Sequence, residues 1–142
     1  MPIKNSQICQ GGTGSHYQRE SLINAGNNGI EFINISPLKS DLIDEVKGEW
    51  LAARPNTDTA LMLGIAHTLH IEGLSDKKFL ENYTEGFDIF LPYLLGTNDG
   101  IEKNAEWASK ICDISVDKIK DLARRMVCLL YTSPSPRDVS SS

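Results

Sequence analysis

The amino-acid sequence predicts an α/β protein in which an incomplete parallel sheet is followed by a helical segment. The run IEFINI at residues 30–35 is rich in β-branched and aromatic residues and is bounded by turn residues, as expected of a strand. Later in the chain, apolar residues recur at helical spacing. A length of 142 residues corresponds to about one domain.

Composition argues against several classes of partner. The net charge is −5 and no basic run exceeds a pair, so neither nucleic acid nor an anionic membrane is expected as a partner. No apolar stretch approaches the roughly 20 residues of a membrane-spanning helix. Cys9, Cys112 and Cys128 form no CxxC pair, so we interpret them as free thiols.

The residues before the strand predict a loop and a short helix. The segment Gly11–Gly14 could cradle a phosphate, but no apolar strand precedes it, so we favour a flexible connection. Residues 17–25 predict a helix that ends at the breaker 26–29. Residues 30–35 are apolar on both pleat faces, which is typical of a covered parallel sheet.

Polar turns follow two candidate strands. The first strand ends in SPLKSD, whose polar residues Ser36, Lys39 and Ser40 form either a ligand-binding turn or an ordinary helix-starting turn. The second candidate strand, residues 49–53, leads into RPNTD. In a doubly wound sheet both turns would lie at one edge and could share a ligand. Helix N-termini at that edge would suit a phosphate or another anion.

A central helix is expected after the second turn. Asn56, Thr57 or Asp58 should cap its start, and Gly73 should end it. The helix is apolar on two faces, so we expect other elements to pack against both of them. The first face carries Leu61, Gly64, Ile65, Thr68 and Leu69, and the second carries Ala60, Leu63 and Ala66.

Four shorter helical segments follow. Ser75 is expected to cap the first of them, and Pro92 to interrupt the second. Their aromatic residues, Phe79 and Tyr83 among them, are predicted to lie in the core. The segments cover residues 76–83, 86–95, 104–111 and 116–126, the last of them capped by Ser115.

No catalytic or metal-ligating set is evident. His67 and His70 lie three residues apart on the central helix, but no third ligand accompanies them, so we favour ordinary helix histidines. No activated nucleophile and no pair of carboxylates for acid–base work stands out. The residues alone therefore predict an incomplete α/β ligand-binding unit.

Three motifs resemble one enzyme family. PIKNSQI at residues 2–8 resembles the pattern NPxKNxQI, and FINISPLKSD at residues 32–41 resembles ISIDPxxTxT. The stretch from RPNTD to DLAR resembles the long segment that follows in the same family. The match covers nearly all of residues 2–126. The chain thus resembles an internal piece of the molybdopterin-dependent S- and N-oxide reductases, which act on trimethylamine N-oxide, biotin sulfoxide or dimethyl sulfoxide.

The resemblance implies a cofactor and a domain. The family holds molybdenum in bis(molybdopterin guanine dinucleotide), transfers an oxygen atom from an S-oxide or N-oxide, and takes two electrons from a donor. Residues 1–127 would be a fragment of its dinucleotide-binding, Rossmann-like domain. By matching position, the cofactor-binding residues would be Lys4, Asn5, Ile35, Ser36, Asn56, Thr57 and Asp58.

Departures from the family pattern limit the expected function. Ser36 stands where the family usually has an acidic residue, and Asn56 stands where Gln or Gly is common. In the family, the serine that ligates molybdenum lies upstream of the matched segment. We therefore expect no catalytic or metal-ligating residue here and no activity from the chain alone. The alternatives are a stand-alone α/β binding module without catalysis and, less favoured because no GxGxxG follows a strand, a nicotinamide-dependent enzyme.

The ends of the chain carry two further expectations. Residues 128–138, CLLYTSPSPRD, do not resemble the family and resemble a translated sequencing adapter. We expect residues 128–142 to be a non-native, disordered tail and Met1 to be an internal methionine. A targeting region would then lie upstream, so the sequence leaves periplasmic and cytoplasmic locations open, together with the preferred oxide and the electron donor.

Overall fold

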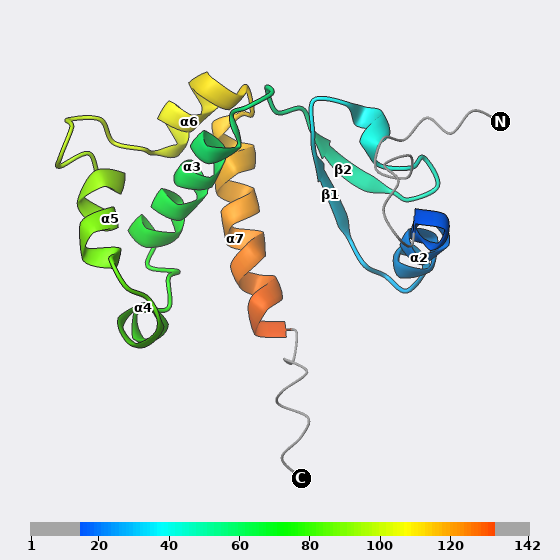
Figure 1. Ribbon diagram of the computed structural model, residues 1–142, viewed down its shortest axis with the longest axis horizontal. Coiled ribbons are helices and arrows are strands. Elements are labelled where there is room, and N and C mark those ends of the chain that lie inside the picture. The colour runs from blue at the N-terminus through cyan, green and yellow to red at the C-terminus, as the bar shows by residue number, and fades with distance from the viewer. Residues whose placement is uncertain (1–14, 133–142) are drawn as a thin grey trace, which may run out of the picture. The chain divides into compact units, whose positions relative to one another are not determined.

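The computed structural model describes residues 15–132, and describes side chains from residue 19 to residue 127 (Figure 1). The chain divides into two compact units, residues 1–55 and residues 56–142. No helix among the described residues is long and apolar enough to cross a membrane.

The first unit contains a parallel pair of strands. It runs through α2 (Ser15–Asn27), β1 (Phe32–Ile35), the 3-10 turn η1 (Lys39–Asp41) and β2 (Gly48–Leu51). The strands pair in parallel, with Phe32 opposite Gly48 and Ile35 opposite Leu51. The α/β class and both predicted strands are confirmed, and the predicted helix at 17–25 lies within α2. The predicted stop is also observed, because Gly29 takes a φ of 86° after α2.

The segment between the strands covers one face of the sheet. A Cβ built on Gly48 would stand 2.3 Å from Leu42 Cδ2, so Leu42 lies directly over β2. Gly26 of α2 lies beside Val46 and Phe32, which places α2 on the same face. The core here is small, and its buried apolar side chains include Ile43, Val46 and Leu51.

The second unit is helical. It contains α3 (Asp58–Ile71), α4 (Lys77–Tyr83), α5 (Phe87–Leu94), α6 (Ala105–Cys112) and α7 (Val116–Thr132). The centre of the unit is α3, which packs against α6 and α7 and touches α5. A Cβ on Gly64 would lie 2.6 Å from the Cβ of Ala108, so a glycine lets α3 and α6 approach closely. Ala108, Cys112, Ile119 and Ala123 are completely buried in this core.

The two apolar faces of α3 are covered unequally. Leu61, Gly64 and Thr68 are buried as predicted, whereas Ile65 and Leu69 are only half-buried. Ala60, a residue of the second predicted face, is buried as expected, and His67 is buried as well. Cover on both sides was expected, but on the second predicted face Leu63 and Ala66 are only half-buried.

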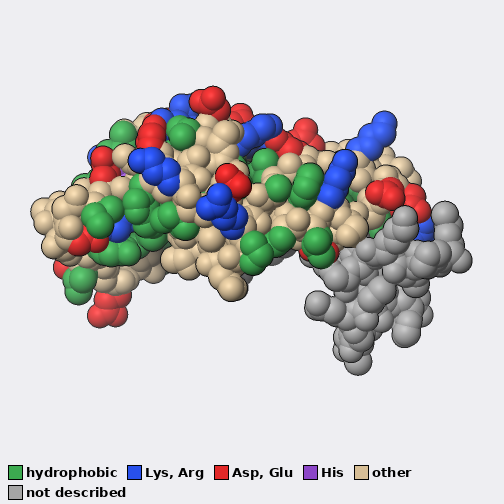
Figure 2. Space-filling view, turned by 90° about the horizontal axis from the view of Figure 1, so that it is seen from above, with side chains coloured by type: hydrophobic (Ala, Val, Ile, Leu, Met, Phe, Trp, Pro, Cys, Tyr) green, Lys and Arg blue, Asp and Glu red, His purple; other side chains and the backbone are tan. Residues whose placement is uncertain are grey.

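Three predictions about α4 and α5 are wrong. The cap of α4 is Asp76, not Ser75, because the Asp76 carboxylate accepts a hydrogen bond from the Phe79 amide at 2.9 Å. Pro92 lies inside α5 without interrupting it. Phe79 and Tyr83 are not core residues, since they are 53% and 76% exposed. Their rings pack on each other at a centroid distance of 5.3 Å. Hydrophobic side chains, coloured green, are exposed at several places on the molecular surface (Figure 2).

The helix predicted at 104–111 is observed as α6, and its cap, which the sequence analysis did not name, is Asn104, whose side chain accepts a hydrogen bond from the Trp107 amide at 2.9 Å. Helix α7 begins directly after Ser115 and continues to Thr132. Its last residues therefore lie within the segment 128–142 that the sequence assigns to a tail. The boundary at residue 127 stays a prediction.

Candidate functional site

The carboxyl ends of β1 and β2 lie at one edge of the sheet, as the two polar turns predicted. Ile35 and Leu51 are paired, and the Ser36 amide donates to the Leu51 carbonyl at 3.2 Å. The chain leaves this edge through residues 52–55, which lead to the start of the second unit. In open α/β sheets this edge is where ligands bind, so the candidate site begins here.

The turn after β1 is stabilised by hydrogen bonds of Ser36. Ser36 is only 8% exposed, its hydroxyl donates to the Asp41 carboxylate, and the same oxygen accepts from the Leu38 amide at 3.2 Å. The Ser36 carbonyl accepts a hydrogen bond from the Trp50 indole at 2.9 Å. Its polar atoms are therefore used within the protein, whereas the neighbouring Ile35 is 40% exposed.

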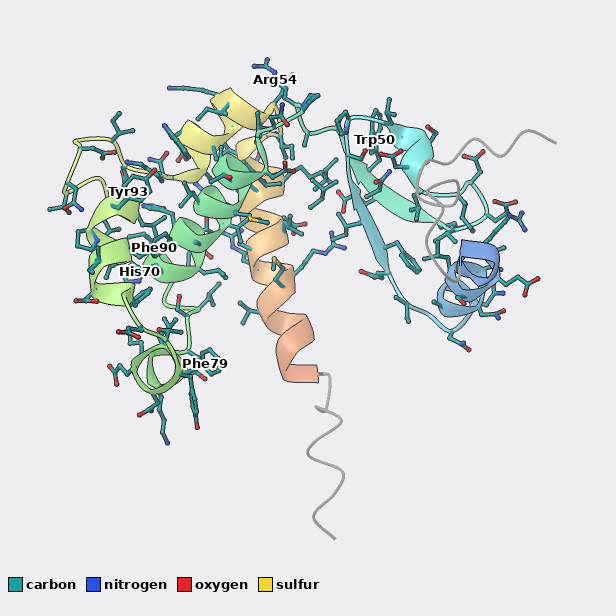
Figure 3. The ribbon with its side chains drawn as sticks, viewed as in Figure 1. Trp50, Arg54, His70, Phe79, Phe90 and Tyr93 are labelled. Atoms are coloured by element: carbon teal, nitrogen blue, oxygen red, sulfur yellow. The ribbon has the colours of Figure 1, made fainter. Side chains whose placement is uncertain are left out.

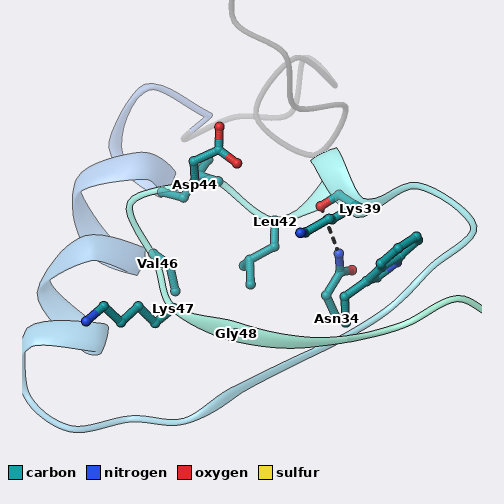
Figure 4. Close-up of a pocket in the computed structure, with 9 residues that line it drawn as sticks. Asn34, Lys39, Leu42, Asp44, Val46, Lys47 and Gly48 are labelled. Atoms are coloured by element: carbon teal, nitrogen blue, oxygen red, sulfur yellow. Dashed lines mark hydrogen bonds between the residues drawn. The ribbon is translucent and has the colours of Figure 1, made fainter.

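A cavity of about 250 Å³ lies against the sheet beside this turn (Figure 4). The Asn34 side-chain amide lines this cavity and donates a hydrogen bond to the Lys39 carbonyl at 3.3 Å. Lys39 and Lys47 are exposed beside it, and Asp44 adds an opposite charge. Its lining consists of Asn34, Lys39, Leu42, Ile43, Asp44, Val46, Lys47, Gly48 and Trp50.

The start of α3 carries the second predicted cluster. Asn56 takes a left-handed φ of 63°, and Thr57 occupies the N-cap position without a side-chain cap hydrogen bond. Asp58 is the first helical residue, and both Asn56 and Asp58 are exposed. One of the three residues was expected to cap the helix with its side chain, but Thr57 makes no such bond. The amide groups at the N-terminus of α3 are thus left without that cap, and they carry the positive end of the helix dipole.

The predicted site residues fall into three groups. Lys4 and Asn5 lie outside the described residues, as does the segment Gly11–Gly14. Ile35 and Ser36 lie together at the strand edge of the first unit. Asn56, Thr57 and Asp58 lie together at the start of the second unit.

Both histidines of α3 have local partners. His67 Nε2 lies 2.8 Å from a Glu102 carboxylate oxygen, and the His70 ring lies 6.4 Å from the ring of Phe87 (Figure 3). Among the side chains that the structure describes, at residues 19–127, no group of three or more His, Cys, Asp or Glu could hold a metal ion. Cys112 is a free, buried thiol, in agreement with the sequence-based interpretation.

Two polar residues that the sequence analysis did not single out hold their surroundings together. The Asp41 carboxylate accepts a hydrogen bond from the Ser36 hydroxyl. In the sequence, only the polar composition of SPLKSD pointed to hydrogen bonds within this turn. Lys103 is 2% exposed, donates to the Ile101 carbonyl at 2.6 Å, and lies 4.2 Å from the centre of the Tyr93 ring. The hydrogen bond from Lys103 lowers the pKa of Asp99, helped by the Ile101 amide. These contacts of Lys103 hold the loop before α6, and no pattern in the sequence predicts that this lysine is buried.

The fold is that of an α/β protein, and comparison with known proteins narrows the class. No family model matches the chain. The chain is 48% identical over 99 residues to the dimethyl sulfoxide/trimethylamine N-oxide reductase of Cereibacter sphaeroides, covering 70% of this chain and 12% of that protein. It is 43% identical over 123 residues to the biotin sulfoxide reductase of the same organism, covering 87% and 16%.

A third relative, the trimethylamine-N-oxide reductase of Pasteurella multocida, is 40% identical over 129 residues, covering 88% of this chain and 16% of that protein. The chain therefore belongs to the family of S- and N-oxide reductases, which are oxidoreductases, and the resemblance seen in its motifs is confirmed. It spans 12–16% of the length of these three relatives.

Proposed function

We propose that this chain is a segment of a molybdenum-dependent reductase of S-oxides or N-oxides, and that it supplies part of the site for one guanine dinucleotide of the cofactor. The observation that carries the proposal is the 40–48% identity to reductases of these two oxide classes. Reductases of trimethylamine N-oxide and dimethyl sulfoxide are molybdenum enzymes. We further propose that the cofactor is bis(molybdopterin guanine dinucleotide) and that the domain which binds it is Rossmann-like.

The start of α3 supports a dinucleotide in this role. Thr57 leaves the first amide groups of a 14-residue helix without a side-chain cap, and such amides suit a phosphate. Exposed Asn56 and the neighbouring Thr57 add short polar side chains that can bond a ribose or a base. The Asp58 carboxylate would repel phosphate, so its place is beside hydroxyl or amine donors.

The strand edge supports the proposal in a modified form. The hydroxyl and carbonyl of Ser36 form hydrogen bonds with Asp41, Leu38 and Trp50. We therefore assign Ser36 the role of shaping the turn. Ile35, at 40% exposure, offers apolar surface beside that turn. A nucleotide at this edge would therefore meet a turn whose geometry is set before binding.

When bound, the cofactor would supply the oxygen-atom transfer, in which the oxide loses its oxygen atom and is reduced by two electrons that a separate donor replaces. The residues of this chain would bind and orient the nucleotide end of the cofactor, away from the reacting atoms. We propose that the chain alone is inactive. Preferred oxide and electron donor are properties of the whole protein.

A chimera tests this function directly. Residues 19–127 would replace the matching segment of the biotin sulfoxide reductase of Cereibacter sphaeroides, a relative at 43% identity. We expect the purified chimera to retain bound molybdenum and guanine nucleotide and to reduce biotin sulfoxide. A matched chimera carrying Thr57→Pro would remove an amide at the start of α3 and should lose nucleotide.

Two outcomes would contradict the proposal. A folded chimera that carries neither molybdenum nor guanine nucleotide would show that the segment does not serve this cofactor. The alternative of an α/β binding module without catalysis would then become the better account. Retention of full cofactor by the Thr57→Pro chimera would remove the start of α3 from the site.

A further inference from the structure

One carboxylate is tied to the ligand-binding edge of the sheet. Asp41 ends the 3-10 turn η1 and is half-buried. Its carboxylate accepts a hydrogen bond from the hydroxyl of Ser36, the residue directly after β1. Its own amide donates to the Leu38 carbonyl at 3.2 Å, which closes the turn. Because Ser36 also bonds the Leu51 carbonyl and the Trp50 indole, both strands fix the position of this carboxylate.

Other carboxylates of the first unit are placed differently. Asp44 and Glu45 stand just before β2, and therefore on the approach to the opposite end of that strand. Glu45 is moreover paired with Arg19 of α2. Asp41 is thus the acidic side chain that the hydrogen bonds of the turn hold at the carboxyl edge.

We propose that Asp41 recognises the ribose hydroxyls of the bound nucleotide, with Ser36 as its positioning residue; this inference rests on the proposed function. A carboxylate accepts hydrogen bonds and cannot donate them, so it suits a diol and repels a phosphate. In dinucleotide-binding α/β folds, an acidic side chain commonly bonds the ribose hydroxyl at this kind of edge. The phosphates would then turn away from Asp41.

The same arrangement explains why the site tolerates a serine at the strand end. The Ser36 hydroxyl is a donor to one Asp41 oxygen and an acceptor from the Leu38 amide, so it locks both the carboxylate and the turn. A carboxylate held by a hydrogen bond loses less freedom on binding than one that must be ordered by its ligand. Position 36 therefore acts through Asp41 and does not need to touch the nucleotide.

The test measures binding of two nucleotides to the full 142-residue chain. The probes are GDP and 2′,3′-dideoxy-GDP, which differ only in the ribose hydroxyls. Because hydrogen bonds to charged groups are among the stronger ones, the unchanged chain should bind GDP about tenfold or more tightly than the dideoxy compound. Asp41→Asn should reduce that ratio to about threefold or less, and it keeps an oxygen that can accept from Ser36.

Two further variants separate a direct contact from a structural role. Glu20→Gln removes an exposed carboxylate of α2, away from the strand edge, and should leave the ratio unchanged. Ser36→Ala removes one hydrogen bond that positions the Asp41 side chain, so it should lower the ratio partly while affinity for the dideoxy compound stays the same. Circular dichroism of each variant verifies that the fold is kept.

The outcomes distinguish this inference from the proposed function. If the chain binds GDP but does not discriminate against the dideoxy compound, or if Asp41→Asn keeps the ratio, then Asp41 is not the ribose contact and the nucleotide site stands. If Asp41→Asn weakens both compounds equally, its role is structural and the inference fails. If the folded chain binds neither compound, the inference about Asp41 fails, whereas the proposed function is decided separately by the chimera.

Discussion

The strand edge of the first unit and the helical core of the second unit are built by different means. At the edge, Ser36 and its partners are fixed by hydrogen bonds between polar groups. In the core, α3, α6 and α7 approach through small residues, and the side chains that meet there are fully buried. The contrast indicates that stability is concentrated in the helices, while the polar groups suited to a ligand lie in the turns.

The two tryptophans allow the units to be followed separately. Trp50 lies on β2 in the first unit, and Trp107 lies on α6 in the second. Replacing either one by phenylalanine leaves a fluorescence signal from the other unit alone. The predictions below concern the helical unit, which Trp107 reports on in the Trp50→Phe background.

The largest effect is expected from Ile119→Ala. Ile119 of α7 is completely buried, so truncation should leave a cavity and lower the free energy of unfolding by about 2–5 kcal/mol. Urea unfolding followed by Trp107 measures the change. Met126→Ala on the same helix is the matched control, because Met126 is 44% exposed and should cost much less. Equal losses for the two variants would show that α7 is not anchored as described.

Gly64→Ala should be the next most damaging change. The new methyl group would stand 2.6 Å from the Ala108 Cβ, and we expect overpacking to cost about 1–3 kcal/mol even though alanine favours helices. The double variant Gly64→Ala with Ala108→Gly removes the clash and should recover most of the loss in urea unfolding. An additive loss in the double variant would mean that α3 and α6 do not meet at this point.

Helix caps test how the sequence pattern was interpreted. Removing the Asn104 side chain by Asn104→Ala should cost about 1 kcal/mol in unfolding free energy, because it caps α6. Asp76→Ala should weaken α4 similarly, whereas Ser75→Ala should change stability very little. Thermal unfolding of the three variants gives the order. A larger loss from Ser75→Ala than from Asp76→Ala would restore the cap predicted from the sequence.

The sequence predicted the elements better than their surroundings. The parallel strands, the common edge of their turns and the helix α6 follow from local signals such as β-branched runs and apolar residues at helical spacing. By contrast, the exposure of Phe79 and Tyr83 depends on what packs against α4, which residue type does not reveal. The bond from Ser36 to Asp41 depends on the course of the turn in space, so the pattern marked the turn without assigning its polar atoms.

The smallest effect concerns the ion pairs on the helical unit. The bidentate hydrogen bonds from Arg124, at 2.7 and 2.8 Å, hold the pKa of the Glu72 carboxyl below its ordinary value, and a hydrogen bond from Lys120 lowers the pKa of Glu106. A carboxyl whose pKa is lower in the folded than in the unfolded state stabilises the fold above its unfolded pKa. That contribution disappears as pH falls through the folded value. The melting temperature reported by Trp107 should therefore fall as the pH drops below about 4.5.

Glu72→Gln should reduce this acid sensitivity, because glutamine cannot be protonated in that range, while Glu81→Gln on exposed α4 serves as the control. Since the pair is exposed, added salt should weaken its effect. If Glu72→Gln and Glu81→Gln give the same pH profile, the Arg124 pair does not contribute to stability. The acid response would then have to come from other carboxylates, and the helical unit would owe its stability to the buried contacts of α3, α6 and α7 alone.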